Sequence, residues 1–116
     1  MDTVQRVRIE YSKKGPVRYI GHLDLMHTFF RALKRANLPV SYTKGFNPRI
    51  KSSFSPALPL GFASEAEYIE LYLDKKIDIS SSIGNLQKEL PEGLTVHNME
   101  KLPLFGNSGN VKIKAV

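Results

Sequence analysis

The chain has 116 residues, 41% of them hydrophobic, which is enough for one domain with a hydrophobic core of its own. It contains no cysteine, which excludes disulfides, zinc–thiolate sites and any iron–sulfur cluster ligated by this chain. The net charge of +6 is concentrated in residues 1–51, where eleven Lys and Arg residues stand against three acidic ones, a local charge of +8. Without a signal peptide or an apolar run of ~20 residues, the sequence predicts a cytoplasmic protein that has no membrane partner.

Two segments near the start of the chain have clear periodicities. Residues 5–11 alternate between apolar and charged side chains, which indicates a half-buried strand whose cationic outer face carries Arg6 and Arg8. Residues 22–36 have a helical period, with Gly21 as the expected N-cap and an Asn-Leu-Pro stop after the last residue. Polar side chains occupy one side of this helix, and a continuous apolar arc occupies the other, formed by Leu23, Leu25, Met26, Phe29, Phe30, Leu33 and Ala36.

The remaining elements complete a recognisable order. Residues 39–43 are predicted as a short strand, and residues 65–73 alternate as the next one. Residues 80–90 carry apolar side chains at helical spacing behind a serine cap, and residues 94–102 form a last strand. The order strand, helix, strand, strand, helix, strand predicts an α+β fold, the ferredoxin-like split β-α-β sandwich, with one antiparallel sheet and two helices on one face.

This predicted domain covers residues 1–104. Residues 105–110 have the composition of a linker, and residues 111–116 begin another alternating strand. A strand that starts at the end of the sequence indicates either a truncated chain or an edge that recruits a partner strand.

A long segment between the second and third predicted strands, residues 43–61, combines cations and aromatics with glycines and prolines. Glycine permits positive φ, and proline stiffens the path of the backbone. We interpret the segment as an RNA-binding loop, in which cations hold phosphates, aromatic rings stack on unpaired bases and Asn47 shapes the turn or reads a base edge. The alternative is an ordered connector with core-filling rings and solvated cations. The residues concerned are Lys44, Arg49 and Lys51 for phosphates, and Phe46 and Phe54 for stacking.

The predicted first helix adds a basic stripe formed by Arg31, Lys34 and Arg35. Because clustered Lys and Arg gain affinity for phosphate backbones by counterion release, the charge of the first half predicts a polyanion footprint. A basic, solvated surface that only keeps the protein soluble explains the same charge. The exposed faces of a strand and a helix normally point opposite ways, so the cations of residues 5–11 need not join this stripe.

Catalytic candidates are few. His22 and His27 are five residues apart, about 140° around a helix axis, so a regular helix does not direct both to one metal ion. His22 is the candidate general base, and no nucleophile-elbow, phosphate-loop, dinucleotide-binding or paired-carboxylate motif accompanies it. The sequence therefore favours a protein without catalytic activity, metal or cofactor of its own, and the enzyme alternative stays open.

Several short motifs occur together: SKKGP at 12–16, HLDLM at 22–26, GFNP at 45–48, PLG at 59–61, and the acidic SE and EY pairs at 64–65 and 67–68. In this combination the chain resembles, over residues 6–74 and more loosely at 90–94, the uncharacterised radical SAM-linked domain found beside or fused to radical S-adenosylmethionine enzymes. The resemblance implies association with radical chemistry on RNA, or with RNA processing, and supplies no activity for the domain itself. Gly21 replaces a serine usual in that family, and Arg49-Ile50 replaces a His-Pro pair, which argues against proton transfer by the loop.

Three functions fit these observations. The leading hypothesis is a non-catalytic RNA-binding accessory domain that presents RNA, tRNA or ribosomal RNA, to a radical SAM partner enzyme. The first alternative is a metal-independent endoribonuclease of ferredoxin-like fold, with His22 as general base and a loop cation at the scissile phosphate. The second is a protein-interaction module that docks on the radical SAM partner through its acidic later half and its terminal strand.

Overall fold

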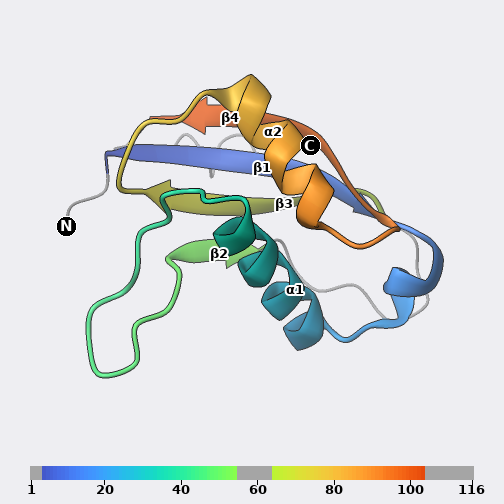
Figure 1. Cartoon of the computed structure of the whole chain (residues 1–116). Helices are drawn as coiled ribbons and strands as arrows, with labels where there is room; N and C mark the ends of the chain where they lie inside the picture. The colour runs from blue at the N-terminus through green and yellow to red at the C-terminus, as the bar shows by residue number, and fades with distance from the viewer. Residues whose placement is uncertain (1–3, 55–63, 104–116) are drawn as a thin grey trace.

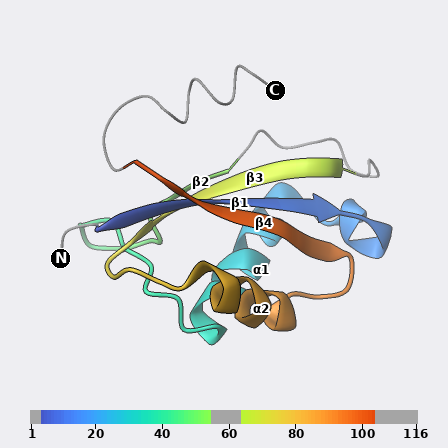
Figure 2. The ribbon, with the colours of Figure 1, turned by 90° about the horizontal axis from the view of Figure 1, so that it is seen from above.

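The computed structural model of the chain describes residues 4–54 and 64–103, which form a four-stranded sheet and two α-helices (Figure 1). In chain order the elements are β1 (Gln5–Lys13), the short 3₁₀ helix η1 (Gly15–Tyr19), α1 (His22–Arg35), β2 (Ser52–Phe54), β3 (Ser64–Leu73), α2 (Ile79–Glu89) and β4 (Leu94–Leu102). The sheet order is β2-β3-β1-β4, and each pair is antiparallel. Both helices cover the same face of the sheet (Figure 2). This arrangement confirms the predicted α+β fold and has the topology of the ferredoxin-like split β-α-β sandwich.

The hydrophobic core lies between the sheet and the helices. β1 and β3 are paired so that Val7 lies opposite Leu71 and Ile9 lies opposite Ile69, and all four side chains are buried. Because side chains alternate across a strand, these residues share one face of the sheet, and they belong to the same buried cluster as Phe29 of α1. Burial of each such side chain contributes roughly 1.5–3 kcal/mol. The apolar positions predicted for these strands are confirmed.

The opposite face of β1 differs from the prediction. Arg6 and Arg8 do alternate with the core residues, but they are only 9% and 8% exposed. Arg6 forms an ion pair of 3.0 Å with Glu70 of β3, and Arg8 forms one of 2.7 Å with Glu100 of β4. The expected cationic outer face is therefore wrong, because the neighbouring strands supply a carboxylate for each guanidinium. This charge is neutralised locally and lies on the sheet face away from α1.

The strand predicted at residues 39–43 is also wrong. Pro39 has no N–H to donate to a ladder, and the segment makes isolated bridges, one of which joins Tyr42 to Ile50. The chain between these two residues doubles back, and we call it the 42–50 hairpin. The edge position beside β3 is taken by β2, which lies inside the segment interpreted from the sequence as a loop.

The second helix has an N-cap that the sequence reading missed. Asp78, not a serine, caps α2, and its carboxylate accepts a hydrogen bond of 3.0 Å from the N–H of Ser81. This bond, assisted by the Ser81 hydroxyl, lowers the pKa of Asp78. A carboxylate suits this position because it accepts from a free N–H of the first turn and because the N-terminus of a helix carries partial positive charge.

The end of the described chain agrees with the prediction, since β4 has the expected bounds. The predicted linker at 105–110 and the predicted strand at 111–116 lie outside the described residues. Within residues 4–54 and 64–103, none of the helices has the length and apolar character needed to cross a membrane.

Candidate functional site

Helix α1 carries more apolar surface than the sheet covers. Leu25 and Phe29 are buried in the core. Leu23 is 62% exposed, and Met26 and Phe30 are partly exposed. These three side chains form one edge of the predicted apolar arc, because residues three and four apart lie on the same side of a helix. An exposed apolar edge of this kind is available to line a binding site.

The 42–50 hairpin is held closed at its neck. The N–H of Thr43 donates to the carbonyl of Arg49 at 2.7 Å, and the N–H of Arg49 donates to the hydroxyl of Thr43 at 3.0 Å. Gly45 turns the tip with a φ of 126°, a conformation that other residues rarely adopt. The ring of Phe46 at the tip is completely exposed. The hairpin therefore presents an aromatic side chain to solvent on a closed loop.

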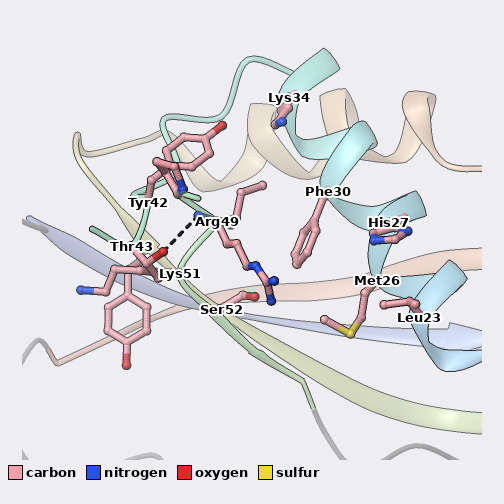
Figure 3. A pocket seen from close by; sticks show the side chains of 13 residues that line it. Leu23, Met26, His27, Phe30, Lys34, Tyr42, Thr43, Arg49, Lys51 and Ser52 are labelled. Carbon is pink, nitrogen blue, oxygen red and sulfur yellow. Dashed lines mark hydrogen bonds between the residues drawn. The ribbon is translucent and has the colours of Figure 1, made fainter. Parts of the chain in front are cut away.

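A pocket of about 820 Å³ lies between α1, the hairpin and the start of β2 (Figure 3). Its volume falls in the range of small-molecule binding sites, roughly 300–1,000 Å³. On the α1 side, Leu23, Met26 and Phe30 form an apolar wall, and the side chain of Arg49 extends from the hairpin towards that wall. The lining consists of Leu23, Met26, His27, Phe30 and Lys34 from α1, and of Tyr42, Thr43, Pro48, Arg49, Ile50, Lys51, Ser52 and Tyr72.

The pocket is positively charged. Its lining, as far as the described residues form it, contains three Lys and Arg side chains and no Asp or Glu. Lys34 lies with Nζ 5.9 Å from the ring centre of Tyr42, so these two side chains connect α1 to the hairpin. Lys51 turns away from Arg49 (Figure 3) and places Nζ 4.9 Å from the ring centre of Tyr72. A concave, cationic surface of this kind raises the local concentration of anions.

The structure brings together some of the binding residues predicted from the sequence and leaves others outside the pocket. Arg49 and Lys51 are part of the lining, together with Lys34 of the basic stripe. Arg31 lies outside the lining but follows His27 by four residues and precedes Lys34 by three, so it flanks the pocket on the helix surface. Four other predicted binding residues are exposed and do not line the pocket: Lys44, Phe46 and Asn47 on the hairpin, and Arg35 on α1.

Phe54 and His22 belong to an aromatic cluster instead. The ring of Phe54 on β2 is partly buried and meets His22, Phe29 and Phe30 edge-on, at centroid distances of 5.7, 6.1 and 5.9 Å. Phe54 therefore packs β2 against α1, and its ring is engaged by protein side chains. His22 is directed at an aromatic ring, and among the described residues no group of His, Asp or Glu side chains has the arrangement of a metal site.

The sequence reading missed several residues of the pocket. Leu23, Met26 and Phe30 belong to the predicted apolar arc, and the sequence predicts no binding role for them. The available signal was position within that arc, since these three residues lie at one edge of it, beside the polar side of the helix. Tyr42 was assigned to a strand, and nothing in its local sequence indicates that the chain turns back there to face Lys34.

Comparison with known proteins identifies a family. No curated protein and no solved structure matches the chain. A family model matches residues 6–115, which is nearly the whole chain and includes every described residue of the pocket. The family is described as an uncharacterized protein conserved in bacteria. The chain thus belongs to the DUF2344 family of uncharacterized bacterial proteins.

Proposed function

We propose that this domain binds single-stranded RNA through the pocket and the 42–50 hairpin. The observation that carries the proposal is the lining of the pocket: three cationic side chains, among the described residues no acidic one, and an apolar wall beside them. Phosphates require the cations, and unpaired bases require apolar or aromatic faces. A basic surface that only keeps the protein soluble needs neither the recessed shape nor the apolar wall.

The side chains have separate roles in this proposal. Arg49 and Lys34, which reach the pocket from opposite sides, hold backbone phosphates. The exposed ring of Phe46 stacks on a base at the tip of the hairpin, where Lys44 adds charge and Asn47 reads a base edge or stabilises the turn. Arg31 and Arg35 attract the RNA from the surface of α1, and Lys51 adds charge at the mouth of the pocket. Phe54, whose ring packs on three others, has no role in RNA binding.

We further propose that the domain is a non-catalytic accessory of a radical SAM enzyme that modifies RNA, tRNA or ribosomal RNA. The support is the resemblance carried by the SKKGP, HLDLM and GFNP motifs. The chain has no cysteine to bind the cluster, so the partner supplies the radical chemistry and this domain supplies affinity for the substrate. Co-purification of the two proteins after ribonuclease treatment tests whether they contact each other directly.

The RNA proposal is tested by fluorescence anisotropy with a labelled single-stranded RNA over roughly 50 to 200 mM salt. We expect affinity to fall steeply with salt, and we expect Arg49→Ala and Lys34→Ala each to weaken binding by roughly tenfold, as for the loss of a charge-assisted contact. Lys88→Ala is the matched control, because Lys88 is an exposed cation on α2 and is not in the pocket lining. Absence of binding at the lowest salt, or equal effects of the three substitutions, contradicts the proposal.

A further inference from the structure

We infer that the pocket receives the base of one unpaired nucleotide, so that the domain selects RNA in which a base is free to leave the stack. The inference rests on the proposed function and makes it more specific. It assigns the base to the apolar wall formed by Leu23, Met26 and Phe30, and the adjoining phosphate to Arg49 and Lys34.

The first argument is the arrangement of apolar and charged groups. Lys34 comes from α1 and Arg49 from the hairpin, and the apolar wall runs along α1 from Phe30 to Leu23, beside the end of the Arg49 side chain (Figure 3). A double helix offers phosphates on its surface but keeps the apolar faces of its bases stacked inside. Only an unpaired base carries an apolar face and a phosphate that can reach both kinds of surface at once.

The second argument is the chemistry of the wall. Phe30 offers an aromatic ring, and the guanidinium of Arg49 extends towards it (Figure 3). Aromatic rings and guanidinium planes are the groups on which proteins stack unpaired bases. Met26 is a flexible side chain that adapts its shape to different partners. These groups accept any base, so the pocket selects for an unpaired nucleotide more strongly than for a particular sequence.

The third argument is exposure. Leu23 is 62% exposed and Tyr42 is 44% exposed, and both border the pocket, whereas most large hydrophobic side chains of the described chain are buried. Phe46 is fully exposed on the hairpin that forms one side of the pocket. Exposed apolar side chains gathered beside a recess mark a surface that is covered when a ligand binds.

The chemistry recognised here, a base with its phosphate, has two sources: a nucleotide within RNA and a free mononucleotide. The test therefore uses three probes. Two are RNA hairpins of equal length and charge, closed by the same structured tetraloop, one with 2-aminopurine as a single bulged base and one with 2-aminopurine paired in the stem. The third is free adenosine monophosphate as a competitor. Binding is followed by the fluorescence of 2-aminopurine and by anisotropy of an end label.

We expect the bulged hairpin to bind about tenfold more tightly than the paired one, as expected for one added base-stacking contact, and the bulged 2-aminopurine to change its emission on binding. Leu23→Ser and Phe30→Leu should each reduce this preference several-fold and leave the salt slope unchanged, because they remove apolar surface and no charge. Leu23→Ser keeps the test valid if Phe30→Leu impairs folding, since Leu23 is mostly exposed. Tyr19→Ser, at an exposed aromatic residue that does not line the pocket, is the control and should leave the preference intact.

The outcomes separate the inference from the proposed function. Equal binding of bulged and paired hairpins, with the effect of Arg49→Ala retained, overturns the inference and leaves RNA binding standing. Adenosine monophosphate that binds as tightly as the bulged hairpin also overturns it, because the site then serves free nucleotides. Failure of every RNA probe to bind overturns both.

Discussion

Thr43 and Arg49 are joined by two hydrogen bonds, one from each backbone N–H, at 2.7 and 3.0 Å. The first ends on the carbonyl of Arg49 and the second on the side-chain hydroxyl of Thr43. The pair closes the neck of the 42–50 hairpin and fixes the backbone from which the Arg49 side chain extends into the pocket (Figure 3). A threonine side chain therefore determines the position of the cation that we assign to phosphate binding.

Thr43→Val tests this dependence. Valine keeps the shape of threonine and the bond from the backbone of residue 43, but it removes the acceptor for the N–H of Arg49. A hydrogen bond of this kind contributes about 1 kcal/mol, so we expect roughly fivefold weaker RNA binding in the anisotropy assay. Thr95→Val, at an exposed threonine on β4, is the control. Unchanged affinity of the Thr43 variant would show that the hydroxyl does not position Arg49.

RNA binding by the cations that line the pocket and by those outside it should respond differently to salt. Arg31 and Arg35 are exposed on α1 and do not line the pocket, so their attraction for RNA is screened within a Debye length of about 8 Å at physiological salt. We expect the double variant Arg31→Ala/Arg35→Ala to slow association at low salt and to bind almost normally at high salt. Arg49→Ala should remain weaker at both. Stopped-flow association rates measured at two salt concentrations distinguish these behaviours, and equal losses for both variants would contradict the division.

The turn before β4 requires glycine at position 93. Gly93 has a φ of 103°, and a Cβ atom there would lie 2.4 Å from the carbonyl oxygen of Lys14 and 2.7 Å from a methyl group of Val17. The same turn accepts a hydrogen bond of 2.9 Å from the N–H of Lys14. We expect Gly93→Ala to lower the free energy of unfolding by roughly 2 kcal/mol or more, from backbone strain and from the clash. Gly84→Ala is the control, since a Cβ at Gly84 meets no atom within 4 Å, and urea unfolding provides the measurement.

The parts of the fold that the sequence predicts are those decided by local periodicity. β1 and β3 each have a regular apolar pattern, and the structure buries the apolar residues of β1 and the more apolar set of β3. In α1 it buries Leu25, Phe29 and Leu33 of the apolar arc and leaves Leu23 mostly exposed. The pairing of Arg6 with Glu70 joins residues 64 positions apart, and that of Arg8 with Glu100 joins residues 92 apart. Such pairs depend on strand register, which no local pattern fixes. The prediction that Arg6 and Arg8 point away from the core is therefore correct, and the prediction that they form a free cationic surface is wrong.

The candidate site was predictable to a similar degree. The composition of residues 43–61 indicated a binding segment, and two of its cations, Arg49 and Lys51, do line the pocket. The apolar wall of the pocket was not predictable from the sequence, because Leu23 and Phe30 look like core residues in a helical projection. The exposed apolar edge of α1 becomes one side of a pocket because the hairpin lies opposite it. The position of the hairpin follows from the bridge between Tyr42 and Ile50, which the sequence does not indicate.

Gln87 of α2 protects the edge of the sheet. Its amide donates to the carbonyl of Leu94 at 2.9 Å and accepts from the N–H of Val96 at 2.7 Å, so one side chain supplies the partners that another strand would give to β4. Gln87→Ala leaves both backbone groups without these bonds in a partly buried setting. We expect it to lower the free energy of unfolding by roughly 1–3 kcal/mol and to increase self-association, measured by urea unfolding and light scattering. Lys88→Ala, at the next residue, should do neither.

Tyr11 makes the stability of the fold depend on pH in the alkaline range. Its ring is buried against Phe29 at a centroid distance of 4.7 Å, and its hydroxyl donates to Glu67, its partner across the strands, at 3.4 Å. Burial, then the charge of Glu67 and the hydrogen bond to it, raise the pKa of Tyr11 well above its usual value. The folded protein therefore keeps this proton at a pH where the unfolded chain, with a tyrosine pKa of about 10, releases it.

Because the unfolded state then binds fewer protons than the folded state, stability is complete below about pH 10 and falls as the pH rises further. At one pH unit above the ordinary tyrosine pKa, the wild type should lose roughly 1.4 kcal/mol more than Tyr11→Phe, which has no such proton. Urea unfolding of both proteins near neutral and at alkaline pH measures the difference. Tyr19→Phe, at an exposed tyrosine outside the core, is the control and should follow the wild type. An equal alkaline loss in the wild type and Tyr11→Phe would mean that Tyr11 ionises as readily in the folded protein as in the unfolded chain, and the burial of its hydroxyl against Glu67 would then be wrong.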